Sequence, residues 1–238
     1  MDETVRLELG TRGFFSGGGF SGSFTVVTVR VKNIAFVKDV TVHYTPDNHN
    51  WKDQALAHSF FAGDHDIFKG TVNEDVEQFV IRYAADGQTQ YDNYFGKNYR
   101  LDLALAAVGK NVVLHTATAR RGTEAGGGFT FTTSWLEGDV LVNNLSFAKS
   151  VGVRMSADGG TTWQDTGASF AGQHLPDSTF IGPAEIWHFQ TPELNLNAAS
   201  AVFQFAVFYR NGATGEVFWD NNFGQDYHVD KADGTMVR

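Results

Sequence analysis

Apolar and polar residues alternate along several short segments of the chain, as expected of strands that bury one face. In TVVTVRVK (25–32), VTVHY (40–44) and QFVIRY (78–83), every second residue is a large apolar one, and FQFAVFY (203–209) repeats the pattern. The positions predicted to face inward are Val27, Val29, Val31, Val40, Val42, Tyr44, Phe79, Ile81, Tyr83, Phe203, Phe205, Val207 and Tyr209. Turn sequences such as PDN, ADG and DGG separate these runs, which favours an antiparallel β-sandwich.

The chain contains the same arrangement of segments twice. YDNYFGKNYRLD (91–102) returns as WDNNFGQDYHVD (219–230) with six of twelve positions identical, and VKNIAFVKDV (31–40) returns as VNNLSFAKSV (142–151). Between these segments Trp51 aligns with Trp163 and Phe68 with Phe180, and GGGF precedes both copies, at 17–20 and 126–129. The second copy carries an insertion before its last long strand. Asn33 and Asn144 are 144 − 33 = 111 residues apart, far beyond the roughly 20 to 50 residues of solenoid repeats, so the pattern indicates a duplicated domain.

These patterns predict an all-β protein of two tandem immunoglobulin-like antiparallel β-sandwich domains, residues 1–112 and 113–238. We expect the connection between 110 and 122, because ATARRGTEAGGG is small, polar and rich in glycine. The segment LDLALAAVG (101–109) alternates as a strand would and is also compatible with a helix; we assign it to the end of the first domain.

Composition narrows the range of functions. A net charge of −9 disfavours binding to nucleic acid, whose phosphates require a basic surface. The chain has no cysteine, which excludes disulfides and thiolate chemistry and leaves the redox compartment open. No signal peptide and no run of 18 apolar residues is visible, so we expect no membrane span. A cytoplasmic protein and a secreted protein whose leader has been removed fit equally well.

Four aromatic residues lie outside the alternating strands, at strand–loop junctions: Trp51, Tyr91, Trp163 and Trp219. One interpretation is that these rings fold back as a lid on the sandwich. The other is that they form flat stacking platforms flanked by Asn and Asp, which suit a sugar: its axial C–H groups lie on the ring while its hydroxyls find polar partners around it.

The segments VKNIAF with a following Lys, VTVHYTPDNHNW, EQFVIRY and YDNYFGKNY resemble family 21 carbohydrate-binding modules, the starch- and glycogen-binding β-sandwiches of fungal glucoamylases and glycogen-targeting phosphatase subunits. The resemblance covers about 80 residues of the first copy (24–102) and the corresponding part of the second (135–230). It implies a first sugar site at Trp51 and Tyr91, and at Trp163 and Trp219. The outward strand position of that site departs from the family pattern, being Val80 in one copy and Ala206 in the other.

The resemblance also implies a second, lower-ranked site in each copy. Its residues are Phe36, Phe60 and Phe68 in the first copy, and Phe147, Phe170 and Phe180 in the second, with Phe at positions where the family has Tyr. The expected polar contacts are Asn93, Asn221 and Asn222, for which an Asx turn that shapes the loop is an equal alternative. Asn33, Asn144, Lys38 and Lys149 are expected to order the loop that carries the Phe.

Other motifs are weaker. SADGGTTW (156–163) fits an Asp-box pattern but occurs once, so we interpret it as a turn device. GDHD (63–66) is better explained as a solvated loop than as a metal site, because neighbouring residues on an extended chain point in opposite directions. We expect no catalytic residue, metal or cofactor.

The sequence therefore predicts a non-catalytic protein that binds an α-glucan polysaccharide or oligosaccharide through two repeated domains, with an associated glycan-active enzyme as a further candidate partner. The alternatives are a structural or adhesive module whose aromatic residues contact protein, and an accessory part of a glycan-active enzyme. Phosphatase recruitment is not expected, since VRLEL (5–9) is the nearest match to the basic-Val-x-Phe docking motif and lacks the Phe.

Overall fold

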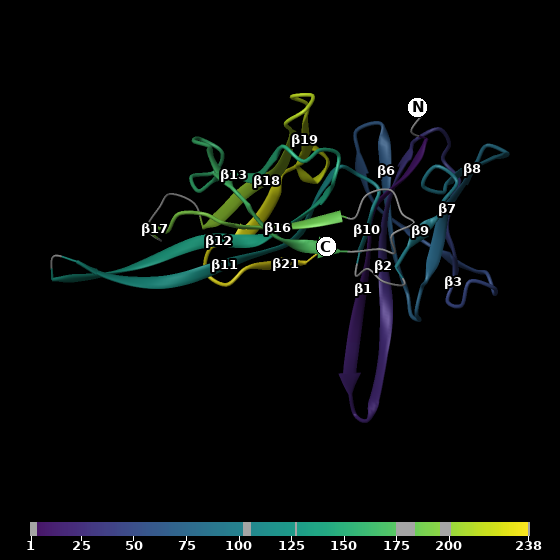
Figure 1. Ribbon diagram of the computed structural model, residues 1–238, viewed down its shortest axis with the longest axis horizontal. Helices are drawn as coiled ribbons and strands as arrows, with labels where there is room; N and C mark the ends of the chain where they lie inside the picture. The colour runs from purple at the N-terminus through teal and green to yellow at the C-terminus, as the bar shows by residue number, and fades with distance from the viewer. Residues whose placement is uncertain (1–3, 102–105, 127, 175–183, 196–200, 238) are drawn as a thin grey trace. The chain divides into compact units, whose positions relative to one another are not determined.

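The computed structural model describes residues 4–101, 106–126, 128–174, 184–195 and 201–237 (Figure 1). The chain divides into two compact units between Lys110 and Asn111, the second comprising Asn111–Gln173 and Ala184–Arg238. Strands dominate both units, and the only helical element in the described ranges is a single 3₁₀ turn, η1 (Asn222–Gly224). The all-β prediction is confirmed. None of the described helical structure is long or apolar enough to cross a membrane.

The first unit consists of two sheets with antiparallel strand pairs. The first sheet contains, in spatial order, β10 (Ala106–Val108), β1 (Val5–Gly17), β2 (Phe20–Lys32), β6 (His65–Val72) and β5 (Ala57–Ala62). The second contains β4 (Lys52–Ala55), β3 (Lys38–Thr45), β7 (Gln78–Ala85) and β8 (Gln88–Asp92), with β9 (Tyr99–Arg100) also paired to β7.

The second unit repeats this arrangement. One sheet contains β15 (Ser169–His174), β16 (Ala184–Gln190), β12 (Phe129–Asn143), β11 (Val112–Gly126) and β21 (Thr235–Val237), with β17 (Leu194–Asn195) also paired to β12. The other contains β14 (Gln164–Gly167), β13 (Lys149–Ser156), β18 (Val202–Asn211) and β19 (Val217–Asp220), with β20 (Tyr227–Asp230) also paired to β18. The topological equivalence of the two units explains the sequence repeat.

Each unit is a sandwich because its apolar core is built from the inner faces of both sheets. In the first unit Val29 of β2 and Val42 of β3 belong to one buried cluster, and in the second Val140 of β12 joins Val153 of β13. All thirteen residues that the alternation predicted to face inward are at most 5% exposed. Period-two patterning therefore identified the core faces correctly.

A long hairpin opens each unit, and the first GGGF segment, residues 17–20, lies at the tip of its hairpin. Gly18 and Gly19, between β1 and β2, have φ angles of 59° and 83°, the left-handed region that a two-residue type I′ turn requires at both central positions. Between Thr25 and the hairpin tip, β2 no longer pairs with β6, and β1 and β2 continue as a two-stranded ribbon (Figure 1). In the second unit β11 and β12 form the corresponding hairpin.

Most of the glycine-rich stretch proposed as the connection between domains, residues 117–126, lies in β11. The strand pairs with β12 without a break from Thr116 to Gly126, so this part of the stretch belongs to a hairpin ribbon. Of the segment 101–109, Ala106–Val108 forms strand β10, paired with β1, and residues 102–105 lie outside the described part.

Candidate functional site

The loop before the first predicted platform residue of each unit is shaped by one aspartate. In the second unit the Asp158 carboxylate accepts hydrogen bonds from the N–H groups of Thr161 (3.0 Å) and Thr162 (2.9 Å) and from the hydroxyls of Thr162 (2.6 Å) and Ser156 (2.8 Å). These bonds, that of the Thr162 hydroxyl first, lower the pKa of Asp158 to about 2. The Asp-box segment is a turn device, as predicted, and it ends at Trp163.

Asp47 shapes the corresponding loop of the first unit through the same kind of hydrogen bonds. Its Oδ1 accepts hydrogen bonds from the N–H groups of His49 (2.9 Å) and Asn50 (2.7 Å), and Oδ2 accepts one from the Asn50 side chain (2.6 Å). The backbone bond from Asn50 is the main cause of a pKa of Asp47 well below its usual range. Both loops are thus fixed by charge-assisted hydrogen bonds just before a tryptophan.

Trp51 leaves this loop and lies on the outer face of the β4-β3-β7-β8 sheet. Its ring stacks on the imidazole of His43, with centroids 4.8 Å apart and planes 14° from parallel. His43 Nδ1 lies 2.6 Å from Asp53 Oδ1 on the neighbouring strand β4. The indole is 38% exposed, so one face is supported by the imidazole and a large part of the ring remains accessible.

Tyr91 lies on the same outer face. It is opposite Arg82 in the β7–β8 pair, and directly opposed residues of an antiparallel pair project to the same side. Its ring is 57% exposed. The structure therefore places the two residues predicted for the first site of this unit on one sheet face, with Val80 and Arg82 of β7 between the strands that carry them.

In the second unit Trp163 and Trp219 occupy the matching positions and are 39% and 40% exposed. Trp163 Nε1 donates a hydrogen bond to the Gly160 carbonyl at 3.1 Å, which fixes the indole against its loop. Trp219 lies beside Phe208, with ring centroids 5.3 Å apart, and under the Arg154 guanidinium, whose central carbon is 5.0 Å from the ring centroid. None of the four junction aromatics is closed off in the interior, as the lid interpretation required.

Arg154 takes the strand position that His43 has in the first unit. His43 is opposite Val80, and Arg154 is opposite Ala206, in equivalent strand pairs. Arg154 donates from Nε (2.6 Å) and Nη2 (2.8 Å) to the two oxygens of Asp165, which hold the pKa of that carboxyl below its usual value. Each platform thus has a nitrogen-bearing side chain, held by a carboxylate, against one of its indoles.

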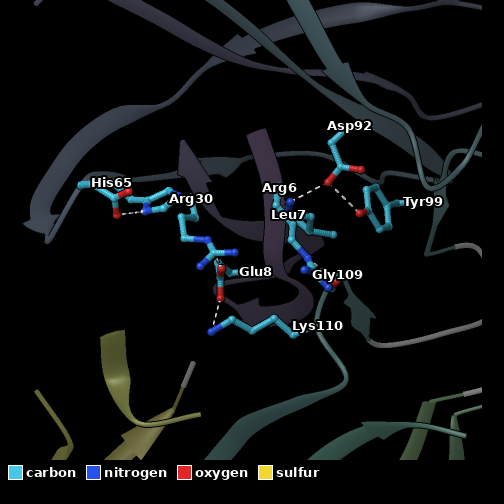
Figure 2. A network of polar contacts seen from close by, with 10 residues as sticks. Arg6, Leu7, Glu8, Arg30, His65, Asp92, Tyr99, Gly109 and Lys110 are labelled. Atoms are coloured by element: carbon cyan, nitrogen blue, oxygen red, sulfur yellow. Dashed lines mark hydrogen bonds and ion pairs between the residues drawn. The ribbon is translucent and has the colours of Figure 1, made fainter. Parts of the chain in front are cut away.

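The repeated Asp-Asn motif begins with a structural contact. In the first unit Asp92 Oδ2 accepts hydrogen bonds from the Leu7 N–H (2.6 Å) and the Tyr99 hydroxyl (2.8 Å), which ties the two sheets together (Figure 2). Burial, with the nearby Asp92 charge, raises the pKa of Tyr99 well above its usual value, so the hydroxyl stays a donor. In the second unit Asp220 repeats both contacts.

The asparagines after this aspartate are engaged in their own turns. Asn93 Oδ1 accepts a hydrogen bond from Gly96 N–H (2.9 Å), and Asn221 Oδ1 accepts one from Gly224 N–H (3.0 Å). Asn222 Nδ2 donates to the Asp226 carbonyl (3.1 Å). These bonds match the Asx-turn alternative. A role of the same side chains in contacting sugar stays a prediction.

The second group of aromatics is only partly as expected. Phe36 and Phe147 are fully exposed, and Phe170 is 53% exposed. Phe68, however, is 6% exposed and belongs to the core cluster, so it presents no face to a ligand; this expectation was wrong because the ring points inward from β6. Phe60 is half-buried, and Phe180 lies outside the described residues.

Strand register corrects the alignment of this second group. Phe68 is opposite Val29 in the first unit, and Trp187 is opposite Val140 in the second, so Trp187 corresponds to Phe68. Phe170 meets Trp187 edge to face at 5.9 Å, just as His58 meets Phe68 at 5.5 Å. Sequence reasoning missed Trp187 because the insertion before β16 contains Phe180 at nearly the expected spacing.

A buried ion pair supports this group in each unit. Lys38 Nζ lies 2.7 Å from Asp66 Oδ2, and Lys149 Nζ lies 2.9 Å from Glu185 Oε2. Lys149 also donates to Asn144 Oδ1 at 2.5 Å, which orders the loop before it as predicted. Trp187 Nε1 donates to Glu185 Oε2 at 2.9 Å, so the carboxylate orients the indole as well.

The comparisons with known proteins point to one family. The family model described as "Carbohydrate/starch-binding module (family 21)" matches residues 125–230. The second unit is similar to family 21 modules. This match confirms the resemblance for the second copy over the whole range predicted for it, 135–230.

Curated relatives agree with the family 21 match. Glucoamylase 1 of Rhizopus oryzae is 33% identical over 95 residues (37% of this chain), and protein phosphatase 1 regulatory subunit 3E of Homo sapiens is 37% identical over 90 residues (38% of this chain). The chain spans 15% and 29% of their lengths. Among solved structures, the chain is similar to the starch-binding domain of Rhizopus oryzae glucoamylase in complex with β-cyclodextrin and maltoheptaose, at 28% sequence identity. The alignment covers 41% of this chain and 92% of that domain, with a TM-score of 0.31.

No group of three or more potential metal ligands occurs among the described residues. In the GDHD segment, His65 Nδ1 lies 2.6 Å from Asp64 Oδ1, whereas Asp66 points inward to Lys38. The adjacent Asp64 and His65 side chains thus contact each other, which the extended backbone did not predict, while Asp66 is directed away from them to Lys38.

Proposed function

We propose that this chain binds α-glucan chains, such as starch, glycogen or malto-oligosaccharides, without chemically transforming them. The observation that carries the proposal is the pair of exposed aromatic rings on the outer sheet face of each unit, Trp51 with Tyr91 and Trp163 with Trp219. Each pair is bordered by charged side chains that can hydrogen bond to hydroxyls, which is the combination a pyranose requires. The family 21 match in the second unit supports the same conclusion.

We further propose that the first unit, residues 1–112, is a binding module of the same kind as the second, residues 113–238. The support is the shared construction of the two units: the aspartate-shaped loop, the Asp–Tyr contact, the buried Lys–carboxylate pair and the strand register. Two binding modules on one chain can raise the affinity for a long polymer by roughly 10²- to 10⁴-fold when both engage the same molecule.

The proposal is tested by co-sedimentation with insoluble starch and with glycogen. We expect the unmutated chain in the pellet and the Trp51→Ala, Trp163→Ala double variant in the supernatant. Phe20→Ala is the matched control, because Phe20 is a 78% exposed aromatic far along the β1–β2 ribbon from either platform loop in sequence and register. Retention of the unmutated chain in the supernatant refutes glucan binding, and release of reducing ends from starch refutes the non-catalytic assignment.

A second candidate function, a protein contact, is favoured by one observation. Phe14, Phe15 and Phe20 lie near the tip of the β1–β2 hairpin and are each more than half exposed. Phe15 and Phe20 face the same side of the ribbon, since Phe20 is opposite Gly17, and exposed apolar rings that share a face are typical of interaction sites. If the structural or adhesive reading is right, replacing these three residues by serine removes the chain's partner while leaving starch binding intact.

A further inference from the structure

A groove of about 430 Å³ lies on the outer face of the first unit, beside the Trp51 platform. Its polar lining residues come from three strands: Lys38, Asp39 and Thr41 from β3, Asp53 from β4 and Arg82 from β7. Lys38 is paired with the buried Asp66. We propose that this groove is a subsite that holds one pyranose ring of the glucan through its hydroxyls. The inference rests on the proposed glucan binding and goes beyond stacking on the aromatic residues.

The groove adjoins the aromatic residues at both sides. Asp53, in its wall, contacts His43 at 2.6 Å, and His43 is the residue on which Trp51 stacks. Arg82 is directly opposite Tyr91 in the β7–β8 pair. A glucan lying on the two rings therefore passes over Arg82, which places hydroxyls of the chain above the groove.

The charged groups of the groove are held near one another without saturating their hydrogen-bonding capacity. Arg82 Nη2 donates to Thr41 Oγ1 at 3.2 Å, and Thr41 Oγ1 donates to Asp39 Oδ1 at 2.6 Å. The Asp39 and Asp53 carboxylates are 3.6 and 4.0 Å from Arg82 Nη2, beyond hydrogen-bond distance. Guanidinium donors and carboxylate acceptors thus face one space, where adjacent sugar hydroxyls can bond to both.

The chemistry of the lining selects the class of ligand. The lining carries two cations, Arg82 and Lys38, and two carboxylates, Asp39 and Asp53, so its charges balance, and donors together with acceptors suit a neutral ligand rich in hydroxyls. The volume lies within the range of small-ligand sites, about 300 to 1,000 Å³. A single hexose unit of a longer chain fits these conditions.

The second unit replaces Arg82, Thr41 and Asp39 at the same strand positions and keeps a carboxylate, Asp165, in the place of Asp53. Phe208 stands in the place of Arg82, since Phe208 is opposite Trp219 as Arg82 is opposite Tyr91. Gly152 stands in the place of Thr41, and the Phe208 ring covers it so closely that a Cβ there would lie 2.7 Å from the ring. The second unit thus offers an apolar surface where the first offers a polar groove, and we infer that the two units bind the same glucan differently.

The test is calorimetric titration with maltoheptaose of a chain whose second platform is removed by Trp163→Ala and Trp219→Ala. In this background Arg82→Phe introduces the residue of the second unit, and we expect Kd to rise at least about tenfold, the effect of losing one hydrogen bond to a charged group. Asp39→Ser, a second residue swap at an exposed position, is expected to raise Kd several-fold. Phe20→Ala, at an exposed aromatic of the β1–β2 ribbon outside the groove lining, is the control and should leave Kd within twofold.

The outcomes separate the groove from the platform. If Arg82→Phe and Asp39→Ser both stay within twofold of the background while Trp51→Ala abolishes binding, the groove is not a subsite and platform binding stands. If the background chain and the unmutated chain both fail to bind maltoheptaose, glucan binding and the groove fall together. Circular dichroism melts establish that each variant is folded, and Asp39→Ser tests the groove even where Arg82→Phe unfolds the unit.

Discussion

Asp220 accepts a hydrogen bond from the hydroxyl of Tyr227 at 2.8 Å in the second unit, at the distance that separates Asp92 from Tyr99 in the first. The same Asp220 oxygen accepts the Leu114 N–H at 2.8 Å from the opposite sheet. One carboxylate therefore joins the two layers of the sandwich to the turn that follows it. This contact gives the recurrence of the Asp-Asn segment a structural cause in addition to its place beside a platform aromatic.

Removing this carboxylate should destabilise the second unit strongly. Asp220→Ala leaves a buried N–H and a buried hydroxyl without their acceptor, and each unsatisfied group costs about 1 to 3 kcal/mol. We expect a loss of about 2 to 5 kcal/mol in the free energy of unfolding, and about 1 kcal/mol for Tyr227→Phe. Urea unfolding with amide exchange resolved for each unit measures both. A loss under 0.5 kcal/mol for Asp220→Ala, by the same principle, contradicts the structural role.

The Lys149–Glu185 pair should be costly to break on one side only. Lys149→Met leaves Glu185 buried without its cation, a change that typically costs about 3 to 5 kcal/mol. The double variant Lys149→Met, Glu185→Met removes the unpaired charge and should recover most of this loss. Thermal and urea unfolding of the two variants make the comparison. Equal destabilisation of both would show that the pair acts through packing instead of charge.

The loop before Trp163 should keep its folded conformation in mild acid. Because the pKa of Asp158 is lowered to about 2 from 3.8, the stabilisation from its ionised form is complete above about pH 4 and is lost as pH falls through about 2. In a Trp51→Ala chain, maltoheptaose affinity should therefore change little through this loop between pH 7 and 4 and weaken toward pH 2. Asp158→Asn should bind more weakly at neutral pH and lack this acid transition. An unchanged acid transition in that variant would assign it to another group.

The effect of adding a side chain at the tip of the first hairpin should come from backbone strain alone. Gly19 has a φ of 83°, and a Cβ there would meet no atom within 4 Å, so Gly19→Ala adds strain without a clash. We expect a cost of about 1 to 2 kcal/mol to the local stability of the ribbon, measured by amide exchange. Gly17→Ala is the control, because that position has an equally open surrounding and no left-handed φ. Equal effects of the two changes would rule out the backbone explanation.

The sequence was sufficient to predict the sheet layers of the fold, but only part of the candidate site. Alternation identified the inward residues because a strand with one buried face has a period of two, and the repeat predicted two equivalent units. The glycine-rich composition suggested a linker, whereas Thr116–Gly126 pairs with β12 in a hairpin, since glycine marks hairpin tips as readily as linkers. Trp187 was missed because spacing fails across an insertion, whereas strand register survives it.

The side chains around the platforms could not be predicted from local pattern. Neither His43 nor Arg154 was predicted as a site residue, because the contact of His43 with Trp51 depends on the loop between them and that of Arg154 with Trp219 joins parts of the chain that are distant in sequence. The groove beside Arg82 depends on three strands at once. Burial of Phe68 likewise follows from the direction of β6, which the loop alignment did not reveal.

The most direct test of glucan binding by two platforms is the stoichiometry of maltoheptaose binding by calorimetric titration. We predict that Trp51→Ala and Trp163→Ala each remove one class of binding events from the unmutated chain, and that the double variant loses the binding carried by both platforms. Binding of unchanged stoichiometry and affinity in the double variant, or no binding by the unmutated chain, would contradict this account.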